Sequence, residues 1–130
     1  MSFSIKWDEK YSHIIHLNIR GSWLWDEFYA AMEKLHDEID ASSHEKVDFI
    51  VNIRTGQMLP QNFIPRMRKA SSQRHSKAGT MLIVGARRFP KLVFSIMEKL
   101  LPDTVEDVYM VDTMDAAYEI LLEQHSQSGK

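Results

Sequence analysis

The stretch VDFIVNI, residues 47–53, decides the fold class of this chain. It is short, mostly apolar and rich in β-branched residues, and it lacks a clean alternation of polar and apolar positions. This pattern is typical of a strand that is covered on both faces of a sheet. Such strands have parallel neighbours, and the connecting helices provide the cover. We therefore predict an α/β fold with this strand in the core of the sheet.

On the amino-terminal side of this stretch, the sequence predicts a β-hairpin and then a helix. Apolar residues alternate with polar ones in 3–7 and in 15–19, and residues 8–11 form the turn region between them. Ser22 is the expected N-terminal cap of the helix that follows. The apolar stripe of this helix, at helical spacing, consists of Leu24, Phe28, Ala31, Leu35 and Ile39.

On the carboxyl-terminal side, two further helix and strand pairs are predicted, followed by a last helix. The second helix begins near Asn62, because Pro65 is tolerated only in a first turn. Strands are expected at 80–84 and 105–111, and Asp112-Thr113 introduces the last helix. In the second helix Phe63, Met67 and Ala70 are expected to face inward. The apolar residues of the other two helices are Leu92, Phe94, Ile96 and Leu100 in the third, and Ala116, Ala117, Ile120 and Leu121 in the last.

The predicted order of elements is ββαβαβαβα. Strands separated by helices of this length imply right-handed crossovers, and hence a mostly parallel five-stranded sheet with one antiparallel edge strand and four helices. We expect one domain over residues 1–125, without a repeat or an internal linker, and a disordered tail at 126–130.

Composition excludes several classes of protein. The chain has 130 residues, 44% of them apolar, and no cysteine, so disulfides, thiolate nucleophiles and Cys-ligated metal sites are ruled out. No apolar stretch approaches the length that spans a bilayer, and residues 1–10 lack the apolar core of a signal peptide. The expected location is the cytoplasm.

Charge is strongly segregated along the chain, and this points to a partner surface. Segment 49–97 holds nine basic residues and no acidic one, so the rest of the chain carries all 18 acidic residues and seven basic ones. In the second helix, Arg66, Lys69 and Arg74 are candidates for an exposed basic face that meets an acidic protein, an anionic lipid surface or nucleic acid. One hypothesis is a homo-oligomer, in the simplest case a dimer, in which this face meets the acidic first helix of another copy. The alternative is a solvated helix face.

Nucleic acid is a disfavoured partner for the basic segment. The isoelectric point is near 6.3, and the remainder of the chain is acidic. An aromatic stacking motif is also missing. A protein partner therefore explains the basic segment better than nucleic acid does.

A second candidate site lies where the carboxyl ends of parallel strands converge, because open α/β sheets place ligands there. Arginines beside glycine turns and helix N-termini bind phosphate, sulfate or carboxylate through charge-assisted hydrogen bonds. The alternatives are solvated arginines and aromatic residues that belong to the core. The candidate anion-binding residues are Arg54, Thr55, Gly56, Arg87 and Arg88, and the candidate pocket-lining residues are Trp23, Trp25, Met58, Leu59 and Phe63.

The chain resembles the STAS fold, the family of anti-anti-sigma factors and sulfate-transporter regulatory domains, and especially its STAS/SEC14-like branch. The resemblance covers roughly residues 13–123. It rests on a strand ending in Arg20-Gly21, the acidic first helix, the strand 47–53, and the closing VYMVDT at 108–113 followed by two alanines. It implies a non-enzymatic regulatory or protein-interaction module. The SEC14-like branch also implies an alternative, a binding domain for a small anionic or lipid-like ligand.

The same resemblance suggests one candidate modification site. Phosphorylatable STAS proteins carry a serine or threonine just after the central strand, and the nearest hydroxyl in this chain is Thr55. Asn52 stands about where the family often has an acidic residue, and the usual Asp-Ser-Ser/Thr-Gly pattern is absent. Thr55 is therefore a weak candidate for phosphorylation.

Catalytic and metal-binding motifs are missing from the sequence. It contains no nucleophile elbow, no HExxH and no defined pair of acidic residues in a cleft. His13 and His16 are the only close pair of histidines, and on a strand they point to opposite faces. We expect no metal, no cofactor and no enzymatic activity, with an enzyme of unknown chemistry as a third hypothesis.

Overall fold

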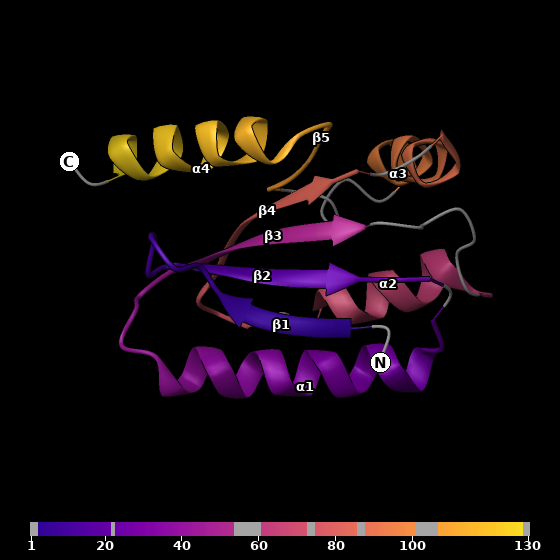
Figure 1. The fold of residues 1–130 in the computed structure, drawn as a ribbon. Coiled ribbons are helices and arrows are strands. Elements are labelled where there is room, and N and C mark those ends of the chain that lie inside the picture. The colour runs from indigo at the N-terminus through magenta and orange to yellow at the C-terminus, as the bar shows by residue number, and fades with distance from the viewer. Residues whose placement is uncertain are drawn as a thin grey trace.

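The structure of the chain is a computed structural model (Figure 1) that describes residues 3–21, 23–53, 61–72, 75–85, 88–100 and 107–128. Its elements follow the predicted order. They are β1 (Phe3–Trp7), β2 (Ile14–Ile19), α1 (Trp25–Ala41), β3 (Val47–Ile53), α2 (Phe63–Ser72), β4 (Ala78–Val84), α3 (Arg88–Leu100), β5 (Val108–Val111) and α4 (Met114–Ser128).

The five strands form one mixed sheet in the order β1-β2-β3-β4-β5. β1 runs antiparallel to β2, with Phe3 opposite Ile19, and every other neighbouring pair is parallel. This confirms the predicted α/β class and the antiparallel edge strand. β3 is the middle strand, and its first five residues are buried, as expected for a strand covered on both faces.

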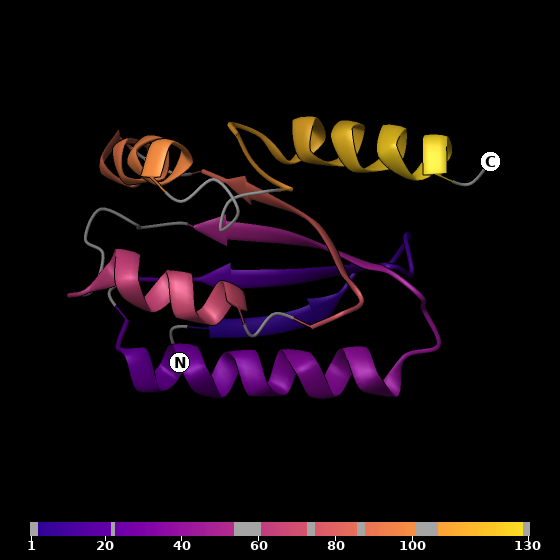
Figure 2. The ribbon, with the colours of Figure 1, turned by 180° about the vertical axis from the view of Figure 1, so that it is seen from behind.

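Helices cover the sheet from two sides. Alternation along β2 directs Leu17 toward α1 and α2, where it packs with Phe28 of α1 and with Met67 of α2. The opposite face directs Ile14 toward α4, where Leu121 is fully buried. In Figure 1 α2 lies behind β1 and β2, and in Figure 2 it lies in front of them. Residues of α1 and α2 share one core cluster, and Trp25 of α1 packs on Phe63 of α2, so the two helices form one layer.

A buried acidic residue interrupts the regular pairing of β3 with β4. The pairing register shifts between Val47 and Phe49, and the Asp48 carboxylate between them accepts a hydrogen bond from the Thr80 backbone N–H at 2.9 Å. A Cβ on Gly79 would lie 2.3 Å from Asp48 Oδ1. Glycine is therefore needed at position 79 to let the carboxylate reach the neighbouring strand.

The start of α1 differs from the prediction. Leu24 occupies the N-cap position, where its backbone N–H donates to the Glu27 carboxylate at 3.2 Å. Leu24 is 70% exposed, because it precedes the first helical turn and lies outside the buried stripe of the helix. Ser22, the predicted cap, lies outside the described residues. The rest of the predicted stripe is buried, namely Phe28, Ala31, Leu35 and Ile39.

The apolar residues of α3 divide between a covered and an exposed side. Among the described side chains of this helix, Met97 is buried and Phe94 is half-buried, whereas Leu92 and Ile96 are exposed. Positions 94 and 97 share the inward face, and 92 and 96 lie on the opposite side of the helix. Of the apolar residues that the sequence placed on this helix, Phe94 is therefore on the covered side and Leu92 and Ile96 are on the exposed side.

The carboxyl-terminal elements agree with the sequence except at their ends. Asp107 has a left-handed backbone with φ of 65° and precedes β5, so the strand is shorter than predicted. Thr113 Oγ1 accepts a hydrogen bond from the Ala116 N–H at 3.1 Å and caps α4. α4 runs to Ser128, which corrects the start of the predicted tail at 126. None of the described helices has the length and apolar character needed to cross a membrane.

Candidate functional site

The predicted anion cup falls almost entirely outside the described residues. Arg88 begins α3, but its side chain is not among those described. The anion-binding hypothesis therefore stays a prediction. The predicted site residues that lie outside the described ones are Arg54, Thr55, Gly56, Met58, Leu59, Arg74 and Arg87.

The three described pocket-lining candidates lie together at the start of α1. The ring centroids of Trp23 and Trp25 are 5.1 Å apart, and those of Trp25 and Phe63 are 6.2 Å apart. Trp23 also stacks on Phe28 of the core, at 5.5 Å. These rings are half-buried and fill the space between one another. The structure thus brings the predicted residues together, but as a packed aromatic cluster.

Arg66 ties α2 to this cluster. Its guanidinium lies 5.2 Å from the centroid of the Trp25 ring, and its Nη1 donates to the Tyr29 hydroxyl at 3.4 Å. The Trp25 indole N–H donates to the Gln61 carbonyl at 2.7 Å. The sequence placed Arg66 on an exposed face that meets a partner, and this stays a prediction. In the structure Arg66 is half-buried and its guanidinium packs on α1, because the aromatic rings there attract the cation.

Exposed apolar side chains adjoin the same cluster. Tyr29 is 42% exposed although its ring packs on Trp25 and Phe28, and the neighbouring Leu24 is the most exposed large apolar residue among those described. Sequence reasoning did not single out Tyr29, although its position four residues after Trp25 is a usable signal. We call Leu24, Trp25, Tyr29, Phe63 and Arg66 the aromatic edge.

Charged residues follow the outward side of the α1 and α2 layer. On α1, exposed acidic side chains recur at spacings of seven, four and three residues over about 21 Å of helix. We call them the acidic ridge, which consists of Asp26, Glu33, Asp37 and Asp40. On α2, Arg68 and Lys69 are exposed, and neither makes an ion pair with a described carboxylate. We call them the basic pair.

One member of the acidic ridge contacts the loop after α2. His75 Nε2 lies 2.6 Å from Asp40 Oδ1, and His75 Nδ1 accepts a hydrogen bond from the Lys77 N–H at 3.0 Å. Nε2 is therefore the nitrogen that donates to Asp40. This hydrogen bond, together with nearby positive charge, lowers the pKa of Asp40. Although the His36 ring packs on His75 at 5.4 Å, the described residues form no group of three or more side chains placed to hold a metal ion.

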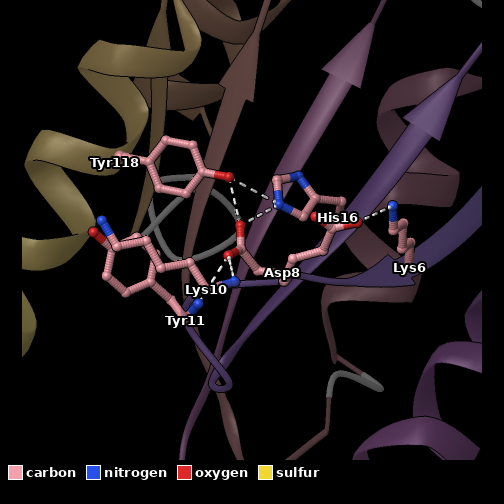
Figure 3. Close-up of polar contacts among 7 residues, drawn as sticks. Lys6, Asp8, Lys10, Tyr11, His16 and Tyr118 are labelled. Carbon is pink, nitrogen blue, oxygen red and sulfur yellow. Dashed lines mark hydrogen bonds and ion pairs between the residues drawn. The ribbon is translucent and has the colours of Figure 1, made fainter.

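A second polar cluster joins the β1–β2 hairpin to α4 (Figure 3). Asp8 Oδ1 accepts hydrogen bonds from the backbone N–H groups of Lys10 and Tyr11, both at 2.8 Å. Asp8 Oδ2 accepts from the Tyr118 hydroxyl and from His16 Nε2, the latter at 2.6 Å. Tyr118 Oη also lies 3.1 Å from His16 Nε2. We call Asp8, His16 and Tyr118 the hairpin clamp.

The clamp is shielded from solvent, and burial together with its hydrogen bonds shifts the pKa values of Asp8 and Tyr118. The Asp8 side chain is 5% exposed and that of His16 is 15% exposed. Burial raises the pKa of Asp8, but the hydrogen bonds from Tyr118, His16 and the two backbone N–H groups outweigh it and hold this pKa well below its usual range. Burial and the hydrogen bond to the Asp8 carboxylate raise the pKa of Tyr118. Asp8 is thus a carboxylate and Tyr118 a phenol.

The hydrogen bonds of the clamp hold the β1–β2 hairpin against α4, which is a structural role. Four donors use both oxygens of Asp8, so the carboxylate has little capacity left to take up a proton. The sequence analysis missed this cluster. An Asp followed by two backbone donors at a turn is a recognisable Asx-turn signal, but nothing in the sequence connects residues 8 and 118.

One described hollow lies at the opposite end of the sheet from the predicted anion cup. It measures about 330 Å³, opens to solvent, and is lined by Trp7, Ser12, Glu38, Ala41, Ser42, Ser43 and His44. The Trp7 indole N–H donates to Glu38 Oε2 at 2.9 Å, and the Trp7 ring packs on His44. This polar, open hollow differs from the enclosed apolar cavity that a lipid-like ligand requires.

The chain has no match among the known proteins with which it was compared. Neither the family models, nor the curated proteins, nor the solved structures give one. The arrangement of the described side chains, and above all the contrast between the aromatic edge and the hairpin clamp, is therefore the basis for a functional proposal.

Proposed function

We propose that this protein is a non-enzymatic interaction module, of the regulatory kind that the resemblance to STAS domains implies. The aromatic edge of α1 and α2 is its contact with a protein partner. The observation that carries the proposal is the 42% exposure of Tyr29, whose hydroxyl accepts a hydrogen bond from Arg66 while the guanidinium packs on Trp25.

The residue types of the aromatic edge support this proposal. Trp, Tyr and Arg are the residues most enriched among those that dominate binding energy at protein interfaces. Arg66 is already held over Trp25, so it loses little side-chain freedom when a partner binds. Covering an exposed leucine such as Leu24 contributes on the order of 1.5 kcal/mol by removing apolar surface from water. Binding here therefore has both an apolar and a directional component.

The hairpin clamp supports the non-enzymatic part of the proposal. The pKa of the Asp8 carboxyl is strongly perturbed, and a perturbed acid in a cleft is a usual catalytic candidate. Its low pKa arises from four donors that hold the fold together, and its carboxylate is almost completely shielded. These contacts favour a structural role over proton transfer.

Site-specific photocrosslinking in cells of the native host tests the proposal. The photoreactive p-benzoylphenylalanine replaces Tyr29 in one variant and Tyr109 of β5 in a matched control, because both tyrosines are 42% exposed. Position 29 is expected to give a discrete crosslinked product that maps to one surface of a protein partner, and position 109 is not. Equal crosslinking from the two positions would contradict the proposal.

A further inference from the structure

We infer that a second copy of this chain is a partner of the α1 and α2 layer. In this dimer the acidic ridge of each protomer lies on the basic pair of the other. The inference rests on the proposed function, because it uses the same layer and names its partner.

The first argument is that the layer carries both charges side by side. Contacts between Trp25 and Phe63, Arg66 and Tyr29, and His75 and Asp40 hold α2 and the loop after it against α1 along its length. Figure 2 shows α1 and α2 side by side. The acidic ridge lies on the side of α1 opposite its buried residues, and the basic pair is exposed on α2, whose Met67 and Ala70 pack inward, so both sets of charges face outward from this layer. A two-fold axis between the helices brings α1 of each protomer onto α2 of the other, so the surface is complementary to itself.

The second argument is that these charges lack partners within the protomer. Arg68 and Lys69 make no ion pair with a described carboxylate, and among the described acidic residues Glu33 and Asp37 make none with a base. Exposed pairs contribute little energy one by one, but complementary patches select the register and speed encounter. The acidic ridge and the basic pair thus specify how two copies are oriented.

The third argument is that an apolar contact adjoins the charges. The aromatic edge offers Leu24 and Tyr29 at the amino-terminal end of α1, beside the ridge that begins at Asp26. Interfaces commonly combine aromatic and arginine contacts at the centre with a polar rim. In the dimer, the edge supplies much of the affinity and the charges supply the geometry.

Charge exchange between two variants tests the inference on the full chain. The first variant is Glu33→Lys with Asp37→Lys, and the second is Arg68→Glu with Lys69→Glu. All four residues are exposed, and circular dichroism establishes that each variant is folded. A matched control, Glu119→Lys with Glu123→Lys, makes the same charge change at the same spacing on the exposed side of α4.

Analytical ultracentrifugation at low ionic strength gives the readout. The wild-type protein and the α4 control are expected to be dimers. Each of the other variants alone should dimerise roughly tenfold or more weakly, and an equimolar mixture of the two should regain a dimer with one copy of each. Salt should weaken the wild-type dimer but leave the apolar contact of the aromatic edge, because about 1 M salt shortens the screening length to about 3 Å.

Three results would overturn the inference: a wild-type monomer, variants that dimerise as tightly as the wild type, and folded monomeric variants that fail to pair when mixed. A wild-type monomer overturns the dimer alone, since position 29 then has to crosslink to a different protein. Equal crosslinking from positions 29 and 109 overturns the proposed function, whatever the oligomeric state.

Discussion

The hairpin clamp and the layer formed by α1 and α2 differ in the burial and the hydrogen bonding of their polar groups. In the clamp, one carboxylate is almost completely buried, and four donors saturate it. On the layer, Arg68, Lys69, Glu33 and Asp37 are exposed and lack ion-pair partners among the described residues. Buried polar groups must be satisfied within the fold, whereas exposed ones remain free to meet another molecule. Substitutions in the hairpin clamp should therefore lower the unfolding free energy, and substitutions on the α1 and α2 layer should weaken association.

The largest expected effect comes from removing the acceptor of the clamp. Asp8→Ala leaves the donors of His16, Tyr118 and two backbone N–H groups without their acceptor, which costs about 3 kcal/mol of unfolding free energy. Urea denaturation measures this loss. Glu9→Ala is the matched control, because Glu9 is exposed and its one ion-pair partner among the described residues is Lys6, so it should cost less than about 1 kcal/mol. Equal losses would contradict the assignment of the clamp.

The next effect tests whether a second buried carboxylate behaves in the same way. Gly79→Ala brings a Cβ to within 2.3 Å of Asp48 Oδ1, so the carboxylate must move away from the Thr80 N–H. We expect a loss of about 2 kcal/mol in thermal unfolding experiments. Gly21→Ala is a useful comparison: it meets no atom within 4 Å but is strained by its positive φ, so about 1 kcal/mol is expected. A larger loss of stability for Gly21→Ala than for Gly79→Ala would contradict this prediction.

The pH dependence of the unfolding free energy tests the hairpin clamp directly, because both Asp8 and Tyr118 have shifted pKa values. The pKa of Asp8 is lower in the folded protein, so its contribution is present above the unfolded value near 4 and is lost as the pH falls further. The pKa of Tyr118 is raised, so its contribution is present below about pH 10 and is lost as the pH rises above that. Urea titrations at a series of pH values from acid to alkaline measure both the loss of unfolding free energy at low pH, the acid limb, and the loss at high pH, the alkaline limb.

The variant Tyr118→Phe provides the control for the pH titration. It removes the phenol and one donor to Asp8, so the decline of stability above pH 10 should become shallower and the acid limb should weaken. An unchanged alkaline limb would show that other groups cause it.

The smallest expected effect on stability belongs to the exposed layer. Arg68→Glu with Lys69→Glu should change the unfolding free energy of the monomer by less than about 0.5 kcal/mol, because surface charges away from buried contacts contribute little. The same variant should lose the dimer. A stability loss comparable to that of Asp8→Ala would remove the distinction between the two regions.

Local patterns predicted much of the fold. The strand 47–53, the hairpin and the start of α2 follow from alternation, from β-branched runs and from the placement of Pro65. The buried face of α3 was not predictable in this way, because apolar residues at 92, 94, 96 and 97 suit more than one inward face. Only packing against the sheet selects Met97.

The candidate site was predictable in part. Charge segregation and the aromatic residues near α1 directed attention to the α1 and α2 layer, and Trp25 and Phe63 do meet there. The direction of Arg66 depends on Tyr29 and Trp25, which lie 37 and 41 positions earlier in the sequence. The partners of a long, flexible cationic side chain are set by the elements that pack beside it.

By itself, the sequence determined the α/β class, the order of the elements and the segregation of charge, because these depend on spacing and composition within short segments. Only the tertiary structure decided that Tyr118 reaches Asp8 across 110 positions, and that acidic and basic helices lie side by side in one layer. The physical reason is that hydrogen bonds and neighbouring charges act over a few ångströms, and the fold alone sets which distant residues come that close.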